Sequence, residues 1–287
     1  MNAAPNAAPR PAQLSGRRVL VTGGSMGIGL EVSRELARRD ARVVVAARGA
    51  DGVNEAVAGL AGSRHQGLVL DVSDSAAWEL GMEAIDEQGP LHGLVAAAGM
   101  LGPIGPLEEL PPEALVATVA VNLVGTMLAL RYSLPRLRMT HGRAVTFSGG
   151  GGTAPLARYD AYAASKAAVV RLTENVASST DIEVNSVAPG FVVTRMHDET
   201  LRAGAEAAGE AYHERTRAQV AEGGFPVGEA AALVCFLLSD AAAGISGRLL
   251  SAQWDPWRDA EFLDRLRTDD SLATLRRIDG MFFGPIG

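Results

Sequence analysis

Short apolar runs alternate along this chain with longer segments of helical period. The runs are rich in Val, Leu and Ala, as in strands buried on both faces of a parallel sheet. We expect strands at 18–22, 41–46, 67–72, 91–98, 143–147, 181–188 and 247–252. The stretches 30–39, 74–87 and 228–238 have the apolar spacing of helices. This alternation predicts βαβ units, and therefore an α/β fold with a parallel sheet.

The first expected strand runs into a glycine-rich turn, Thr22-Gly-Gly-Ser-Met-Gly-Ile-Gly29, which opens a helix. Glycines let a backbone approach a pyrophosphate, and a helix N-terminus offers free N–H groups and positive potential. The spacing differs from the G-x-G-x-x-G of many dinucleotide sites. We interpret the turn as a phosphate cradle; the alternative is a glycine-rich connection that binds no ligand.

The second expected strand is followed by Ala47 and Arg48, with no acidic residue. In nicotinamide-binding folds an acidic side chain near this point holds the ribose 2′-OH, whereas an arginine accommodates a 2′-phosphate. The sequence therefore favours NADP(H), with NAD(H) as the alternative cofactor. Arg48 as a solvated charge at a strand end is the other interpretation.

Tyr162 and Lys166 stand four residues apart in an Ala-rich segment of helical character. Such residues share a helix face, with about 5–6 Å between their Cβ atoms. A cation about 4 Å from the phenol, at an effective dielectric of about 20, is worth roughly 4 kcal/mol. We therefore expect Lys166 to lower the pKa of Tyr162 towards neutrality, so that the phenol can pass protons. Taken alone, the two residues also fit an ordinary surface pair.

Taken in this order, these motifs resemble the short-chain dehydrogenase/reductase family over roughly residues 15–252. The resemblance implies a single Rossmann-like, doubly wound α/β domain with a seven-stranded parallel sheet. It implies an NAD(P)-dependent enzyme that interconverts a carbonyl and a secondary alcohol by hydride transfer. The implied catalytic residues are Asn122, Ser148, Tyr162 and Lys166. The implied cofactor-binding residues are Gly23, Ser25, Met26, Gly27, Ile28, Gly29, Arg48, Asp71, Val72, Ala98, Gly99, Tyr162, Lys166, Pro189, Gly190, Val192 and Thr194.

Two positions depart from the family pattern. Ala96 and Ala97 replace both asparagines of the usual Asn-Asn-Ala-Gly turn. The family's serine stands about thirteen residues before the tyrosine, but Ser148 stands fourteen before it and Gly149 thirteen. We assign Ser148 as the catalytic serine on the expectation that the glycine run 149–152 absorbs one residue.

The resemblance gives each catalytic residue a role. In reduction, Tyr162 would donate a proton to the carbonyl oxygen, and Ser148 would hydrogen-bond the same oxygen. Lys166 would lower the pKa of Tyr162 and hold the nicotinamide ribose. Asn122 would support a proton relay through a helix carbonyl and a water. In oxidation the roles reverse, with the Tyr162 phenolate as the base.

Composition excludes several other classes of protein. The net charge is −7 without a long basic run, which argues against nucleic-acid binding. A lone cysteine, Cys235, excludes an intrachain disulfide framework, and the five histidines show no metal-ligand spacing. No apolar segment is expected to reach the ~20 residues that span a bilayer, and no apolar signal segment precedes the first strand. We expect a soluble, cytoplasmic protein without a metal, and the resemblance implies a homodimer or homotetramer.

Three segments fall outside the core of the expected domain. Residues 1–14 are expected to form a disordered arm. Residues 195–225 correspond to the family's substrate lid. The extension 253–287 contains Trp254 and Trp257 and is expected to pack on the domain or on a partner subunit. Its sharper interpretation is that it walls a substrate pocket, where Arg276 and Arg277 would meet an anionic group.

The sequence leaves the substrate open. A ketoacyl or polyketide-like ketone and a sugar or cyclitol are both compatible with it. A nucleotide-sugar epimerase or dehydratase is the alternative enzyme class. A cofactor-sensing protein without catalysis is the third alternative, but the Tyr162/Lys166 pair argues against it.

Overall fold

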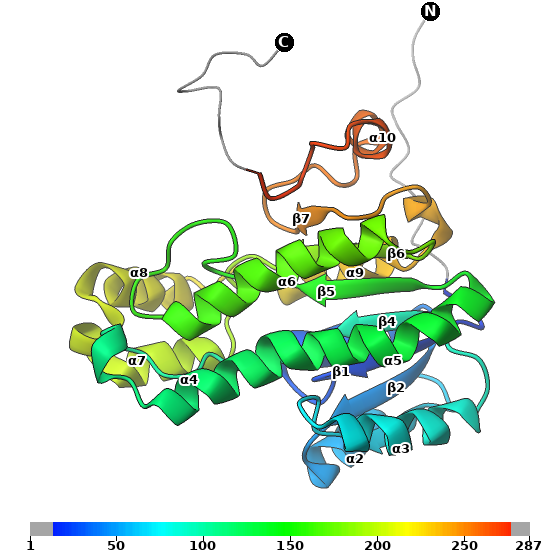
Figure 1. Ribbon diagram of the computed structural model, residues 1–287, viewed down its shortest axis with the longest axis horizontal. Helices are drawn as coiled ribbons and strands as arrows, with labels where there is room; N and C mark the ends of the chain where they lie inside the picture. The colour runs from blue at the N-terminus through cyan, green and yellow to red at the C-terminus, as the bar shows by residue number, and fades with distance from the viewer. Residues whose placement is uncertain (1–13, 277–287) are drawn as a thin grey trace, which may run out of the picture.

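The computed structural model describes residues 14–276, which form a twisted parallel sheet with helices on both faces (Figure 1). The strands follow the order β3-β2-β1-β4-β5-β6-β7, and every neighbouring pair is parallel. This order confirms the expected seven-stranded, doubly wound α/β fold. The strands are β1 (Arg18–Thr22), β2 (Arg42–Ala47), β3 (Gln66–Val69), β4 (Gly93–Ala96), β5 (Arg143–Phe147), β6 (Glu183–Ala188) and β7 (Leu249–Ser251).

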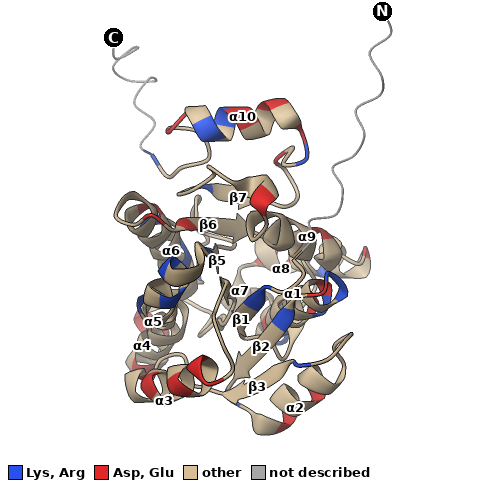
Figure 2. Cartoon of the chain, turned by 90° about the vertical axis from the view of Figure 1, so that its right-hand side faces the viewer, with Lys and Arg blue, Asp and Glu red and all other residues tan. Residues whose placement is uncertain are grey.

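Helices cover the sheet in two layers, each with its own apolar core (Figure 2). One core joins the sheet to α1 and α9, and the other joins it to α3, α5 and α6. Because both faces are covered, the central strands β1, β4 and β5 are buried along their whole length, which explains their mainly apolar sequences. The helices are α1 (Gly27–Arg38), α2 (Ala50–Ala58), α3 (Ser75–Asp86), α4 (Pro112–Val119), α5 (Gly125–Thr140), α6 (Asp160–Ser178), α7 (Arg195–Ala208), α8 (Glu210–Ala221), α9 (Val227–Leu237) and α10 (Ala260–Thr268).

One long helical rod corrects the expectation that no apolar segment is long enough to cross a membrane. Helices α4 and α5 are joined by a π-helical turn, Ala120–Val124, into a run of 29 residues, Pro112–Thr140. By length and composition this run passes as a membrane span. Its inner face, however, packs on the sheet through Ala129, Leu130 and Leu137. The rod is therefore a core helix of this domain that also presents an apolar outer face.

The ends of the described chain both contact the sheet domain. Leu14 is fully buried and its N–H bonds to Arg39 O, so only residues 1–13 of the expected arm lie outside the described residues. In the extension, Trp257 is buried against Phe236 of α9. The N–H of Leu249 in β7 bonds to Ala273 O, so the extension covers the outer edge of the sheet.

The arginine pair of the extension is only half described. Arg276 forms an ion pair with Glu174 of α6, at 3.1 Å, and Arg277 lies outside the described residues. The described part of the extension therefore lies along the β7 edge, and its arginine is engaged by the domain. Figure 1 shows α10 at this edge, away from α7 and α8.

Candidate active site

The glycine turn after β1 touches the turn after β4. Gly23 has φ +66°, and a Cβ there would lie 2.8 Å from the backbone of Ala98. The Ala98 N–H donates to Thr22 Oγ1 at 3.3 Å. A hydroxyl at the end of β1 thus ties the two turns together, a role for Thr22 that the sequence did not indicate. The close approach explains why Gly23 carries no side chain.

The N-terminus of α1 has the features of a phosphate cradle. Met26 stands at the N-cap position in an extended conformation and provides no side-chain cap. A Cβ on Gly29 would lie 2.3 Å from Gly23 O, so the turn closes only with glycine there. The first N–H groups of α1 therefore face the carboxyl edge of the sheet without a side-chain acceptor, where they favour an anion.

Arg48 follows β2 and is exposed, with no ion pair within residues 14–276. The neighbouring carboxylate, Asp71, accepts hydrogen bonds from Ser73 N–H and Oγ at 2.9 and 2.7 Å. These bonds, with a smaller contribution from the charge of Arg48, hold the pKa of Asp71 below its usual value. Arg48 therefore keeps its hydrogen-bond donors available beside the cradle. Val72 is fixed by Trp78, whose Nε1–H donates to its carbonyl at 2.9 Å.

Tyr162 and Lys166 project from the first turns of α6 towards the carboxyl ends of β4 and β5. Lys166 is only 6% exposed, and its Nζ donates to Phe147 O at 3.1 Å. The same Nζ lies 5.8 Å from the centre of the Tyr162 ring. A Cβ on Gly99 would lie 3.6 Å from Nζ, so the turn after β4 closes over the ammonium.

The electrostatics of this pair differ from the expectation. Burial raises the pKa of Tyr162 to about 12, and burial lowers the pKa of Lys166 to about 8. The ammonium bonds to Phe147 O and lies beside the ring instead of bonding the phenol oxygen. Loss of hydration therefore outweighs the attraction between the two groups, and each neutral form is favoured. The expected lowering of the Tyr162 pKa by Lys166 is not observed.

Asn122 connects the π-helical turn to both neighbours. Its side-chain amide accepts from Met100 N–H at 2.8 Å and donates to Met100 O at 2.9 Å. It also donates to Ser165 Oγ at 3.0 Å, and that hydroxyl donates to Tyr162 O at 2.7 Å. Asn122 is fully buried. It therefore fixes the start of α6, and with it the backbone that carries Tyr162.

Ser148 and Tyr162 are not brought together. A Cβ on Gly149 would lie 2.4 Å from the Tyr162 hydroxyl oxygen, whereas the Ser148 Oγ lies 2.2 Å from the position of a Cβ on Gly152. No hydrogen bond joins Ser148 Oγ to Tyr162 in the described part of the chain. The glycine run does not accommodate the extra residue between Ser148 and Tyr162 as we expected, so Gly149 faces the phenol. Gly149 stands thirteen residues before Tyr162, the family's usual spacing, and that spacing could have predicted this arrangement.

We expect Gly149→Ala to lower kcat/KM at least 100-fold, because its methyl group would displace the Tyr162 hydroxyl. Gly150→Ala is the matched control, since a Cβ there meets only Leu156, at an ordinary 3.5 Å. Ser148→Ala should lower kcat/KM less than tenfold, because Ser148 Oγ points towards Gly152 and away from the phenol. Loss of a true oxyanion donor would instead lower the rate about 10²–10³-fold. Steady-state kinetics on the three variants measures this order. A larger loss in Ser148→Ala than in Gly149→Ala would return the catalytic role to Ser148.

The loop after β6 reaches the glycine turn. Gly190 has φ +83°, and the N–H of Val192 bonds to Gly190 O at 3.0 Å. A Cβ on Gly27 would lie 3.8 Å from Thr194 Cγ2, so this loop and the cradle are neighbours. The N–H of Thr194 donates to His197 Nδ1 at 3.2 Å, a contact that the sequence did not indicate. The Val192 N–H is thus engaged within its own loop.

The lid, 195–225, folds as α7 and α8 and closes over Tyr162. Its Met196, Ala208 and Tyr212 pack in one apolar cluster with the phenol. The cluster also includes side chains from the loops after β4 and β5 and from the start of α6: Leu101, Ile104, Leu156 and Tyr159. No sequence motif marked these residues, because they come from separate segments that only the fold brings together.

A family model described as short chain dehydrogenase matches residues 17–204. The chain belongs to the short-chain dehydrogenase family. It is 32% identical to a D-threitol dehydrogenase of Mycolicibacterium smegmatis over 82% of this chain and 90% of that protein. It is 35% identical to a cis-4-hydroxycyclohexanecarboxylate dehydrogenase of Sinomonas cyclohexanicum, over 82% and 94% of the two chains.

A solved structure of this family also resembles the chain. A tryptophan variant of actinorhodin polyketide ketoreductase with NADPH superimposes with a TM-score of 0.73 at 31% identity, covering 82% of this chain and 95% of that one. With these relatives, the chain is an NAD(P)-dependent oxidoreductase that interconverts carbonyl and alcohol groups of small molecules. The epimerase alternative gains no support from them.

The residues present fit a dinucleotide of this kind. The cradle would clash with a Cβ at Gly23 or Gly29, the N-terminus of α1 lacks a side-chain cap, and Arg48 stands free of ion pairs within 14–276. Among the same described residues, no cluster of three or more His, Cys, Asp or Glu side chains has the arrangement of a metal site.

Proposed function

We propose that Tyr162 is the proton donor and acceptor of this oxidoreductase. The carrying observation is that its phenol lies in the apolar cluster under the lid and, unlike the other two phenols there, has Lys166 one turn further along the same helix. Burial keeps the phenol protonated, so Tyr162 is ready to give a proton to a carbonyl oxygen. The nicotinamide cofactor supplies or accepts the hydride when bound.

Lys166, Asn122 and the glycine turn support this step. The ammonium of Lys166 stands behind the phenol and adds positive charge as a phenolate forms. The amide of Asn122 holds the backbone of the first turn of α6 through Ser165. The lid packs against the phenol and leaves Tyr162 half-buried, which strengthens both electrostatic effects. Turnover of NAD(P)H with a panel of ketones, by wild type and by the Tyr162 variant described in the Discussion, tests this assignment.

We propose NADP(H) as the preferred cofactor. Arg48 is exposed, unpaired within 14–276 and placed after β2, where it can meet a 2′-phosphate. We expect Arg48→Ala to weaken NADPH binding about 10- to 100-fold and to change NADH binding less than threefold. Fluorescence titration of both cofactors measures this, and Arg265→Ala, another exposed arginine, serves as the control. Tighter NADH than NADPH binding in the wild type would contradict the preference.

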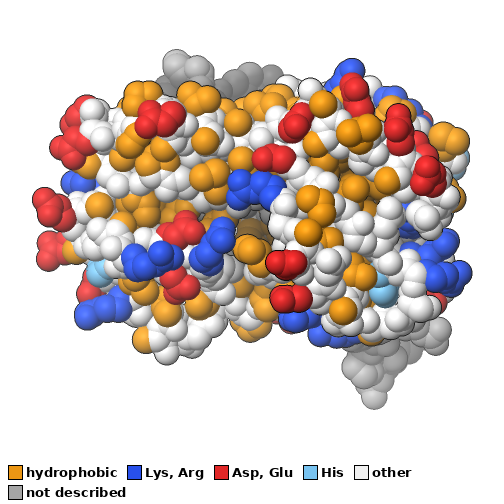
Figure 3. Space-filling view, turned by 90° about the horizontal axis from the view of Figure 1, so that it is seen from below, with side chains coloured by type: hydrophobic (Ala, Val, Ile, Leu, Met, Phe, Trp, Pro, Cys, Tyr) orange, Lys and Arg blue, Asp and Glu red, His pale blue; other side chains and the backbone are white. Residues whose placement is uncertain are grey.

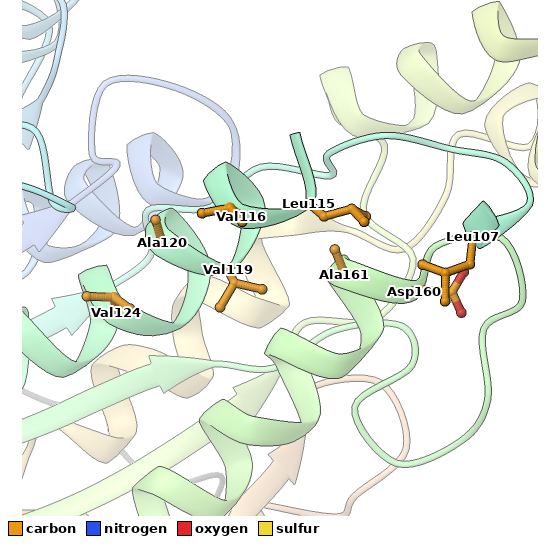
Figure 4. Close-up of a pocket in the computed structure, with 8 residues that line it drawn as sticks. All are labelled: Leu107, Leu115, Val116, Val119, Ala120, Val124, Asp160 and Ala161. Atoms are coloured by element: carbon orange, nitrogen blue, oxygen red, sulfur yellow. The ribbon is translucent and has the colours of Figure 1, made fainter. Parts of the chain in front are cut away.

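We propose that the outer face of α4 and α6 binds a second copy of this chain. A groove of about 470 Å³ lies there, lined almost entirely by carbon (Figure 4). Val116 is 68% exposed at this groove. On another face, the one seen from below, Figure 3 shows hydrophobic side chains interspersed with acidic and basic groups.

The charges along this face are self-complementary. Glu113 and Asp160 lie at one end, and Arg131 lies at the other; none of the three has an ion-pair partner within the described chain. Glu113 and Arg131 are 18 residues apart along the rod. We expect an antiparallel copy to bring Glu113 near the partner's Arg131 in an isologous interface.

The oligomeric state tests this interface. Light scattering after size-exclusion chromatography should give the wild type at least twice the chain mass, and Val116→Glu should give the mass of one chain. Leu80→Glu on α3, at a leucine 71% exposed, is the matched control and should leave the mass unchanged. A wild type that stays monomeric at micromolar concentration would contradict the proposed interface.

We also propose a cytoplasmic location, because the one helix among residues 14–276 that is long and apolar enough to span a membrane packs on the sheet.

A further inference from the structure

Apolar side chains from the lid and from two loops pack around Tyr162. Leu101 and Ile104 come from the loop after β4, and Leu156 comes from the loop after β5. Met196 and Tyr212 come from the lid. A substrate that presents its carbonyl to Tyr162 must part these side chains and then lie against them.

The cluster contains two other hydroxyl groups, those of Tyr159 and Tyr212. The Tyr159 hydroxyl donates to Thr200 Oγ1 at 3.2 Å, and its ring packs edge-to-face on Tyr212 at 5.1 Å between centroids. Of the three hydroxyls, that of Tyr162 has Lys166 beside it and is the one proposed to bond the reacting oxygen of the substrate. Extra hydroxyl groups on the substrate that face the aliphatic side chains of this cluster would be buried without hydrogen-bond partners.

The charged side chains near the cluster are bound to other groups or face away from it. The guanidinium of Arg158 donates to Glu206 O at 2.8 Å, which fastens the loop after β5 to the lid. Asp160 lines the outer groove between α4 and α6 (Figure 4). Lys166 donates to Phe147 O. Among the described residues, this cluster thus holds no free cation that would anchor a substrate carboxylate or phosphate.

We infer that the substrate is an apolar ketone, or the corresponding secondary alcohol, and that Leu101, Leu156, Met196 and Tyr212 select it. This inference rests on the proposed role of Tyr162 and names the substrate class of that site. Polyols, keto-sugars and keto-cyclitols are disfavoured because the aliphatic walls offer their several hydroxyl groups too few partners.

Cyclohexanone and a keto-cyclitol with the same six-membered ring form a matched pair of probes. We expect kcat/KM with NADPH to be at least about 100-fold higher for cyclohexanone, as a site without partners for extra hydroxyl groups requires. Acetophenone should behave like cyclohexanone. Equal or faster turnover of the keto-cyclitol would overturn the inference and leave the proposed oxidoreductase role intact. No turnover of any carbonyl would overturn both.

A pair of variants assigns the selection to these walls. Leu156→Asn should lower kcat/KM for cyclohexanone at least tenfold without lowering that for the keto-cyclitol, so the ratio of the two narrows. Leu80→Asn, at an exposed leucine on α3, should change neither. NADPH affinity measured on each variant shows that it is folded, and Met196→Gln provides a second wall variant if Leu156→Asn fails this check. An unchanged ratio in a folded wall variant would contradict the assignment.

Discussion

Tyr162→Phe removes at least about 10³ of turnover while cofactor affinity stays within threefold. The change deletes one oxygen from a side chain that remains packed among the same apolar neighbours. A positioned general acid contributes about 10²–10⁴ in rate. Here the phenol has no substitute, because Ser148 Oγ is turned towards Gly152 and Gly149 carries no hydroxyl. The expected loss corresponds to about 4 kcal/mol of transition-state stabilisation.

Single-turnover and steady-state kinetics, with cofactor binding followed by fluorescence, measure this outcome. Tyr132→Phe is the matched control. The Tyr132 hydroxyl donates to Ser75 O of α3 at 3.3 Å, and loss of this hydroxyl should leave turnover unchanged. If Tyr162→Phe kept more than a tenth of the wild-type kcat, another group would have to carry the proton.

Lys166→Met abolishes most activity and makes the protein more stable at neutral pH. We expect kcat/KM to fall at least 100-fold, because the charge behind the phenol is lost. Burial lowers the pKa of Lys166 to about 8, whereas the unfolded chain titrates near 10.5. Holding this ammonium inside the folded protein at pH 7 therefore costs about 3 kcal/mol, partly offset by its bond to Phe147 O. The variant should gain about 2 kcal/mol in free energy of unfolding.

The sign of the pH dependence follows from the lowered pKa. The wild-type penalty is complete below about pH 8, declines between pH 8 and 10.5, and is absent above that range. Denaturant unfolding at pH 7 and pH 10 should thus show the gain of Lys166→Met shrinking as pH rises. Arg265→Met, at an exposed arginine, should show no such gain.

Lys166 is the single lysine in the sequence, so one ¹³C-labelled lysine resonance reports its titration directly. A midpoint near 8 is expected in the protein without cofactor. A midpoint at or above 10 would contradict the burial argument, and with it the stability gain.

Local features could be predicted from the sequence alone. The glycine turn, the strands of the sheet and the four-residue spacing of Tyr162 and Lys166 depend on periodicity and on the conformational freedom of glycine. These properties belong to short stretches of chain. The fold therefore contains the expected sheet, and it places the cradle and α6 at the same edge of that sheet.

Other features depend on which segments meet. The sequence indicated a charged pair that lowers a phenol pKa, but the lid and the turn at Gly99 strip water from both groups, and burial decides the direction. It indicated a serine beside Tyr162, but the backbone after β5 turns Gly149 towards the phenol. Orientation and desolvation arise only when the loops are closed.

The sequence by itself determined the class of this protein: a parallel α/β domain with a phosphate cradle and a Tyr/Lys helix, because each is encoded within a few neighbouring residues. Tertiary structure alone decided the character of its site. Side chains distant in sequence, such as Leu101 and Tyr212, meet around Tyr162 only in the folded chain. Their packing sets the hydration of the phenol and the shape offered to a substrate, and neither quantity is a property of any one segment.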